Sequence, residues 1–136
     1  MPPPLPGFFV LHSYGRMAAV TEGEAFWRGL DELVAACRLV IDRPRGTRHP
    51  RYPSFVYPLD YGYLQGTRVA DGDGIDAWVG SLPERRVTAV VCTVDADKRD
   101  TEVKILLGCT PQEARAILAV HNRGSQAGLL LERPDP

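Results

Sequence analysis

The sequence predicts an α+β fold that is mainly β, a small antiparallel barrel or strongly curled sheet with an N-terminal and a C-terminal helix. Two observations indicate this fold. Short strand-like segments follow one another through the middle of the chain, separated by glycine, proline or charged turns. Apolar residues at helical spacing, each series preceded by a capping signal, lie on both sides of that region.

The first expected element is a helix over about residues 22–37. Thr21 stands at the N-cap position and Glu24 follows three residues later, which is the capping-box pattern. Apolar residues then recur at helical spacing: Phe26, Leu30, Leu33, Val34 and Cys37.

A series of strand-like segments follows the helix. "RLVID" is the first, and an irregular basic loop comes after it because its prolines remove backbone donors. The next segments are "FVYP", "YGYLQG", "DAWVGS", "RVTAVVCTV" and "TEVKILLG". A charged turn, Asp95 to Asp100, separates the last two, and their close spacing favours the curled sheet.

The second helix begins at "TPQE" and is expected to run to about His121. Thr110 is the expected N-cap, Pro111 occupies the first helical position, and Glu113 completes a capping box. "QAGLLLE" is the expected last strand.

Length and composition favour one domain in a reducing compartment. The 136 residues, 44% of them apolar, can bury one core, which we expect over residues 21–136, with residues 1–20 as a loosely ordered leader. The formal net charge of -1 gives no general attraction to nucleic acid or anionic membrane. The three scattered cysteines suit reduced thiols, and we find neither a convincing signal peptide nor a membrane span. We therefore expect a cytoplasmic protein without nucleic-acid or membrane partners.

Basic residues crowd the loop after the first strand. Arg43, Arg45, Arg48, His49 and Arg51 lie close together in sequence. Such a run is either a solvated surface segment or an anion-binding loop, and the sequence leaves both interpretations open.

The stretch "DGDGIDAWVG" gathers Asp71, Asp73 and Asp76. If residues 71–73 are extended, the first two carboxylates point the same way about 7 Å apart. Clustered carboxylates repel one another, so a shared site needs a cation or a raised pKa, and Mg²⁺ prefers oxygen ligands. An ordinary turn is the alternative, since aspartate and glycine are common turn residues.

A second acidic group lies at "VDADKRDTEVK". Glu102 and Lys104 alternate with Val103 and Ile105, so the acid and the amine share one face of a strand, opposite an apolar pair expected to be buried. A surface hairpin has the same pattern. If the two acidic groups converge, they form a carboxylate pocket containing a lysine, which favours phosphoryl chemistry.

These motifs resemble the soluble inorganic pyrophosphatases of family I. "DGDGID" is similar to the family signature, with Gly74 in place of its usual proline. "YPLDYGYL" is close to the family's Y-P-x-N-Y-G-Y and precedes Asp71 by the usual interval. Asp97, Glu102 and Lys104 hold the spacing of a second acidic pair and a phosphate-binding lysine, with Glu102 in place of the usual aspartate. Residues 38–108 carry most of the resemblance.

The resemblance implies a five-stranded OB-like barrel, Mg²⁺-dependent hydrolysis of inorganic pyrophosphate to two phosphates, and assembly into a homo-oligomer. It implies Asp73 as the general base, with Lys104, Tyr61 and Arg51 as further catalytic residues. The implied metal ligands are Asp71, Asp76, Asp97 and Glu102, with Asp42 reaching a metal through water. The implied substrate-binding residues are Arg51, Tyr61, Lys104 and Arg123.

The chain also departs from the family pattern, because the segment between Arg51 and Tyr57 is too short for a hairpin that usually carries another phosphate-binding arginine. Three alternatives therefore stay open. One is hydrolysis of another phosphoanhydride, such as a nucleotide. The second is a catalytically silent phosphate- or metal-binding module. The third, an OB-type nucleic-acid binder, is disfavoured because the motif-bearing face is acidic.

Overall fold

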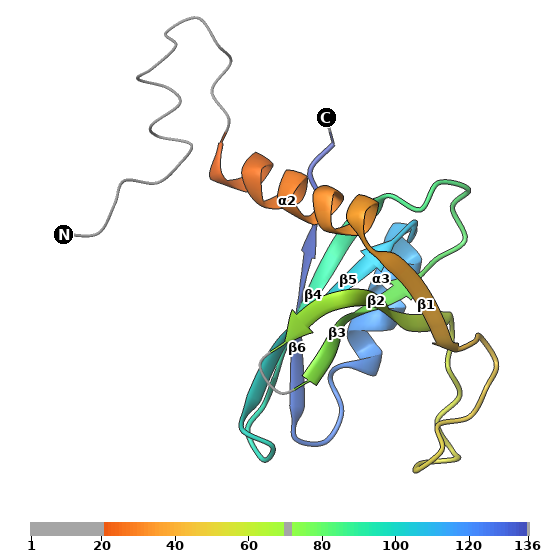
Figure 1. Cartoon of the computed structure of the whole chain (residues 1–136). Coiled ribbons are helices and arrows are strands. Elements are labelled where there is room, and N and C mark those ends of the chain that lie inside the picture. Colours follow the sequence, from red (N-terminus) through yellow and green to blue (C-terminus); the bar gives the residue numbers. More distant parts are fainter. Residues whose placement is uncertain (1–20, 70–71, 136) are drawn as a thin grey trace, which may run out of the picture.

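The computed structural model of the chain describes residues 21–69 and 72–135 and, for Asp73, the backbone but not the side chain. Its elements are the helices α2 (Glu22–Ala36) and α3 (Pro111–Val120) and six strands (Figure 1). The strands are β1 (Arg38–Arg43), β2 (Asp60–Val69), β3 (Gly72–Val79), β4 (Val87–Asp95), β5 (Asp100–Leu107) and β6 (Gln126–Glu132). The α+β, mainly β class is therefore confirmed.

The strands form one open, curled sheet. Their order is β1-β2-β3-β5-β4-β6, and β3 pairs with β5 in parallel whereas the other neighbours are antiparallel. The expected curled sheet is confirmed, and the five-stranded OB-like barrel implied by the resemblance is corrected to an open sheet of six strands in the described residues, with β1 and β6 at its edges. The expected strand "FVYP" is wrong as well, because that segment contributes only an isolated bridge between Val56 and Arg48. Prolines on both sides of it remove ladder donors.

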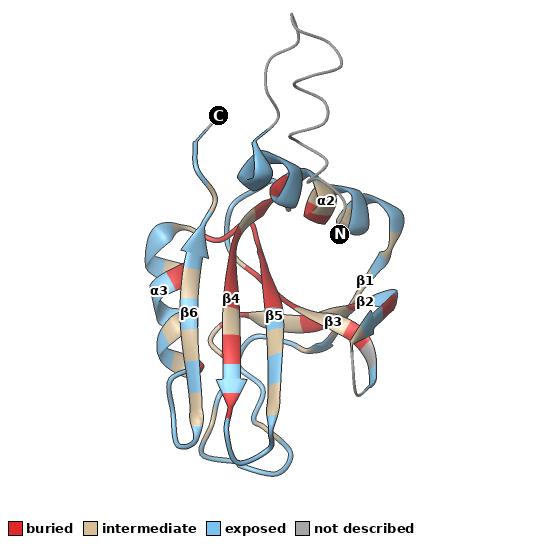
Figure 2. Ribbon diagram, turned by 90° about the vertical axis from the view of Figure 1, so that its left-hand side faces the viewer, coloured by how far each residue is buried: buried red, intermediate tan, exposed pale blue. Residues whose placement is uncertain are grey.

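Two apolar clusters, one on each face, hold the sheet between the helices. Trp27 and Leu30 of α2 pack with Leu64, Val90 and Ile105 on one face. Ala114 and Ile117 of α3 pack on the other face, in a cluster that includes Trp78, Val91 and Leu106. Figure 2 shows α2 across one end of the curled sheet and α3 beside β6. The candidate site described below lies on the α3 face.

Both predicted N-caps are confirmed, with one half of the predicted capping box shown at Thr21 and the whole box at Thr110. The Thr21 hydroxyl accepts a hydrogen bond from the Glu24 amide at 3.0 Å. At α3 the capping box is complete, because Thr110 accepts from the Glu113 amide and the Glu113 carboxylate accepts from the Thr110 amide. Within the described residues, neither helix is long and apolar enough to cross a membrane.

The glycine of "YGY" is required by close strand packing. A Cβ atom at Gly62 would lie 1.8 Å from the Val40 carbonyl oxygen in the neighbouring strand β1. Only a residue without a side chain allows this approach. Gly62 thereby keeps β1 against β2 and fixes the two flanking tyrosines, Tyr61 and Tyr63, on the opposite face.

Candidate functional site

A buried lysine between two carboxylates forms the centre of the candidate site. Lys104 is 6% exposed. Its Nζ atom lies 2.9 Å from Asp76 Oδ2 and 2.9 Å from Glu102 Oε2. It also donates to the Tyr61 hydroxyl oxygen at 3.3 Å. An ammonium group has three protons, so all three are used in these contacts.

Strand register brings these residues together. The parallel pairing of Ala77 with Ile105 places Asp76 beside Lys104, and side-chain alternation puts Glu102 on the same face. On the other side of β3, Tyr61 is opposite Trp78 in the antiparallel pair with β2. Three strands, β2, β3 and β5, therefore each contribute to one cluster. The predicted sharing of a face by Glu102 and Lys104 agrees with this register.

Near Lys104 the structure buries the face of β5 that carries this lysine, whereas the sequence predicted burial of the opposite face, which carries Val103. Val103, expected inside, is 41% exposed, whereas Lys104 is buried. The reason is that α3 and the loop after β1 cover the face of β5 that carries Lys104, while α2 leaves this end of the other face open.

The cluster keeps Lys104 charged. Burial alone lowers the pKa of a lysine, but the neighbouring Tyr61, Asp76 and Glu102 outweigh it and raise the pKa of Lys104. Burial is the main reason why the pKa of the Tyr61 hydroxyl is also raised. At neutral pH Lys104 is therefore an ammonium group and Tyr61 a neutral phenol.

Tyr61 packs against Trp78, which is in turn hydrogen-bonded to His121. The Tyr61 and Trp78 rings are 4.6 Å apart, edge to face. Trp78 Nε1 donates to His121 Nε2 at 3.0 Å, and His121 Nδ1 is 2.9 Å from Gln126 Oε1. Because Nε2 accepts, the neutral ring carries its proton on Nδ1 and donates to Gln126. Burial lowers the pKa of His121, so the ring is neutral near pH 7.

This histidine predicts a pH-dependent stability. Unfolded His121 has an ordinary pKa near 6.5, whereas the folded pKa is lower, so the unfolded state binds the proton first as pH falls. The contribution of His121 to the free energy of unfolding is fully present above about pH 6.5. Below that pH the free energy of unfolding falls by up to about 1.4 kcal/mol per pH unit, until the folded pKa is reached. Urea unfolding between pH 8 and pH 5 measures this slope. His121→Gln, which keeps an acceptor for Trp78, should flatten it, and an unchanged slope would contradict the assignment.

A hollow of about 700 Å³ opens beside Lys104. It lies between the loop after β1, the β4–β5 turn and the segment after α3. The lining side chains that matter most are aromatic or basic: His49, Tyr52, Phe55, Tyr57, Tyr61, Lys98, Lys104 and Arg123. This combination suits a ligand that carries both negative charge and flat or apolar surface.

Of the other described residues predicted for the site, one lines the hollow, and the others are exposed and do not line it. Arg123 lines the hollow, and its guanidinium lies 5.7 Å from the centre of the Phe55 ring. Arg51 is exposed in the loop before β2 and is not among the residues that line the hollow. Asp97 is exposed in the β4–β5 turn, and Asp42 is exposed at a register shift on the edge strand β1. Neither carboxylate contacts the Lys104 cluster.

The predicted metal ligands are described only in part. Asp71 and the Asp73 side chain lie outside the described residues. Among the residues that the structure does describe, no three His, Cys, Asp or Glu side chains gather into a metal-holding group. Asp76 and Glu102 each use one oxygen for Lys104 and have a second carboxylate oxygen, which is the donor type that Mg²⁺ prefers. The donor chemistry fits Mg²⁺ if carboxylates from Asp71 and Asp73 complete the set.

Two acidic residues outside the predicted set of site residues shape the surroundings of the site. Asp95 is 5% exposed, and its Oδ1 accepts from the Asp97 amide, the Lys98 amide and the Ser125 hydroxyl. These bonds lower the pKa of Asp95 and fix the turn. Asp60 holds the loop after β1 by accepting from the Arg45 amide at 2.8 Å. The available signal was the "DADK" turn pattern, in which aspartate accepts from amides two and three residues on.

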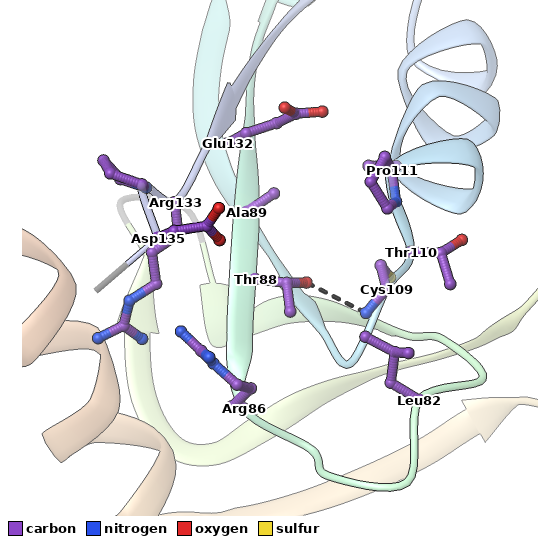
Figure 3. A pocket seen from close by; sticks show the side chains of 12 residues that line it. Leu82, Arg86, Thr88, Ala89, Cys109, Thr110, Pro111, Glu132, Arg133 and Asp135 are labelled. Carbon is purple, nitrogen blue, oxygen red and sulfur yellow. Dashed lines mark hydrogen bonds between the residues drawn. The ribbon is translucent and has the colours of Figure 1, made fainter.

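A second hollow, of about 560 Å³, lies at the other end of α3 (Figure 3). Figure 3 shows Arg86, Thr88 and Cys109 around it, with the Thr88 hydroxyl accepting from the Cys109 amide at 3.1 Å. None of the residues predicted for the site lines it. Burial raises the pKa of the Cys109 thiol to about 12, so the thiol is not an activated nucleophile.

Comparison with known protein families identifies the family of this chain. A model described as Inorganic Pyrophosphatase matches residues 50–128, more than half of the chain. The chain belongs to the inorganic pyrophosphatase family. The match contains Tyr61, Asp76, Glu102 and Lys104, the whole cluster described above, and it confirms the resemblance seen in the sequence. A search of curated proteins found no match.

Proposed function

We propose that this pyrophosphatase-family protein hydrolyses inorganic pyrophosphate to two phosphates in a Mg²⁺-dependent reaction. The observation that carries the proposal is the buried Lys104 held between Asp76 and Glu102, at family-typical spacing and inside the family match. A buried cation next to carboxylates and a phenol suits a small phosphate anion bound together with a metal.

In this proposal Asp71, Asp76, Asp97 and Glu102 would hold Mg²⁺, and Asp42 would reach a metal through water. When bound, Mg²⁺ neutralises phosphate oxygens and lowers the pKa of a bound water. Asp73 takes the proton of the attacking water as general base. Water oxygen bonds to one phosphorus, the bond from that phosphorus to the bridging oxygen breaks, and the second phosphate leaves with the bridging oxygen.

In this proposal a second cation, the Mg²⁺ ion, is needed before Lys104 can bind phosphate. Its three protons are occupied by Asp76, Glu102 and Tyr61, so it binds a phosphate oxygen only by giving up a partner. The Tyr61 contact, at 3.3 Å, is the longest of the three. Asp76 and Glu102 release the ammonium group at low cost only when another positive charge balances them. Tyr61 and Arg123 then complete the proposed phosphate contacts.

Phosphate release from pyrophosphate, measured with Mg²⁺ and again after chelation, tests the proposal. We expect turnover with Mg²⁺ that chelation abolishes. Asp73→Asn should lower kcat by about a hundredfold while the protein stays folded, because a general base contributes at least that much. Asp100→Asn, at an acidic position outside the proposed site, is the matched control and should keep full activity. Equal activity of the two variants would remove Asp73 from the mechanism.

A second candidate is a catalytically silent phosphate- or metal-binding module. The observation that favours it is that Lys104 already supplies a cation to Asp76 and Glu102. In that case the wild-type protein binds phosphate or Mg²⁺ in calorimetry but releases no phosphate under any metal condition. We further infer a cytoplasmic protein with a small-molecule substrate, in keeping with its composition.

A further inference from the structure

The hollow beside Lys104 exceeds what pyrophosphate needs. Pyrophosphate is a small ion without apolar surface, whereas this hollow of about 700 Å³ falls in the range typical of organic ligands and cofactors. Much of its wall is aromatic: His49, Tyr52, Phe55 and Tyr57 come from the loop after β1. Phe55 and Tyr57 also pack in the apolar cluster of the α3 face, whereas Tyr52 belongs to neither core cluster, so core packing does not account for it.

The aromatic wall is held in place before any ligand arrives. The His49 amide donates to the Phe55 carbonyl and the Tyr57 amide donates to the Thr47 carbonyl, both at 2.9 Å, so the loop doubles back on itself. His49 Nδ1 accepts from the amides of Arg51 and Tyr52. The His49 ring stacks on Tyr57 with an angle of 11° between their planes. Preorganised aromatic faces bind planar groups at little entropic cost.

Tyr52 is the aromatic side chain most open to a ligand. It is 60% exposed, its ring lies 5.1 Å from that of His49, and it lines the hollow. Every nucleobase has a flat face that can stack on such a ring. Ser54, also in the lining, offers a hydroxyl group to the polar edge of a base.

The hollow also carries basic groups that suit phosphate. Lys98 and Arg123 line it together with Lys104, and the structure gives neither of the first two a salt bridge within the described residues. The one carboxylate in the lining, Asp95, already accepts three hydrogen bonds from its own turn and from Ser125. Basic groups and aromatic surface thus share one cavity: Arg123 lies 5.7 Å from the Phe55 ring, and Tyr52 lies beyond it, in contact with His49. A molecule with a flat base and phosphates carries the same two kinds of surface.

We propose that this hollow binds a nucleoside 5′-diphosphate, with the base against Tyr52 and the diphosphate toward Lys98, Arg123 and Lys104. The proposal rests on the proposed function for the placement of phosphate at Lys104. Binding of the base is independent of turnover. When the proposed hydrolysis acts on this ligand, the water oxygen bonds to the terminal phosphorus and the bond from that phosphorus to the bridging oxygen breaks. The nucleoside monophosphate leaves with the bridging oxygen, and the proton of the water passes to the general base of the proposed function.

Calorimetric titration with ADP and with pyrophosphate, each with Mg²⁺ present, tests the proposal. We expect ADP to bind at least tenfold more tightly than pyrophosphate, since one base–aromatic stack contributes about that much. Tyr52→Ala should weaken ADP binding about tenfold and leave pyrophosphate binding unchanged. Phe26→Ala is the matched control, because Phe26 is an aromatic side chain 41% exposed on α2 that does not line the hollow.

The outcomes separate this proposal from the proposed hydrolysis. Absent or Tyr52-independent ADP binding in a protein that hydrolyses pyrophosphate would overturn the nucleotide site alone. Tyr52-dependent ADP binding without phosphate release from either ligand would uphold the nucleotide site and overturn the hydrolysis. Equal weakening of both ligands by Tyr52→Ala would place Tyr52 in general folding of the loop and also overturn the nucleotide site.

Discussion

Lys104→Met is expected to destabilise the protein by about 3 kcal/mol when no Mg²⁺ is present. Methionine keeps an unbranched side chain one atom shorter than that of lysine, but it leaves Asp76 and Glu102 facing each other without a cation. Removing one partner from a buried ion pair costs about 3–5 kcal/mol. The lower end applies here because the side chains of Asp76 and Glu102 are 32% and 24% exposed and keep some contact with water.

Urea unfolding with and without Mg²⁺ measures this effect. Mg²⁺ should restore more stability to the Lys104→Met protein than to the wild type, because both carboxylates are then free for it. Lys98→Met, at an exposed lysine of the same hollow, is the control and should change stability by less than about 1 kcal/mol. If Mg²⁺ stabilises the two lysine variants and the wild type equally, Asp76 and Glu102 do not form a metal site.

The sequence predicted which residues belong to the Lys104 cluster better than it predicted which of them are in contact. Side-chain alternation is local, so it placed Glu102 and Lys104 on one face correctly. The contact with Asp76 depends on the parallel register between β3 and β5, which β4 crosses over to create. A local sequence pattern cannot predict this register, because the register is set by packing between strands that are distant in sequence.

Burial was also harder to predict than strand position. A strand in the middle of a sheet has two covered faces, so a lysine can be buried when its charge is paired, and apolar Val103 can be exposed beyond the edge of α2. Sequence alternation identifies the two faces of a strand but not which of them α3 and the loop after β1 cover. That information lies in tertiary packing.

One predicted strand failed for a related reason. "FVYP" has good strand propensity, but the prolines beside it deprive a ladder of donors, and the segment folds into the loop that carries His49 and Tyr52. Helix ends were predicted well at Thr21 and Thr110, since capping depends only on residues three apart. Local signals thus fixed the helices, whereas the site needed long-range contacts.

Gly74→Pro, which restores the usual family residue, is expected to destabilise the protein by about 3 kcal/mol or more. Gly74 has φ of +83°, a value that proline cannot adopt because its ring fixes φ near −65°. A Cβ atom at this position would also lie 2.6 Å from the Tyr63 ring. The backbone of this chain therefore follows a path at position 74 that the family proline does not allow.

The same glycine bears on the function of the motif. Residues three apart in an uninterrupted strand lie on opposite faces, so a D-x-D-x-x-D spacing can serve one site only if the strand is irregular within it. The β2–β3 register shifts between the Leu64–Ile75 and Arg68–Asp73 pairs, and Gly74 lies at that shift. Gly74→Pro should therefore lower Mg²⁺-dependent activity as well as stability, whereas Gly29→Ala, at an open helical position, should lower neither. Thermal unfolding and phosphate release measure the two effects, and a Gly74→Pro protein as stable as the wild type would show that the irregular strand is not needed.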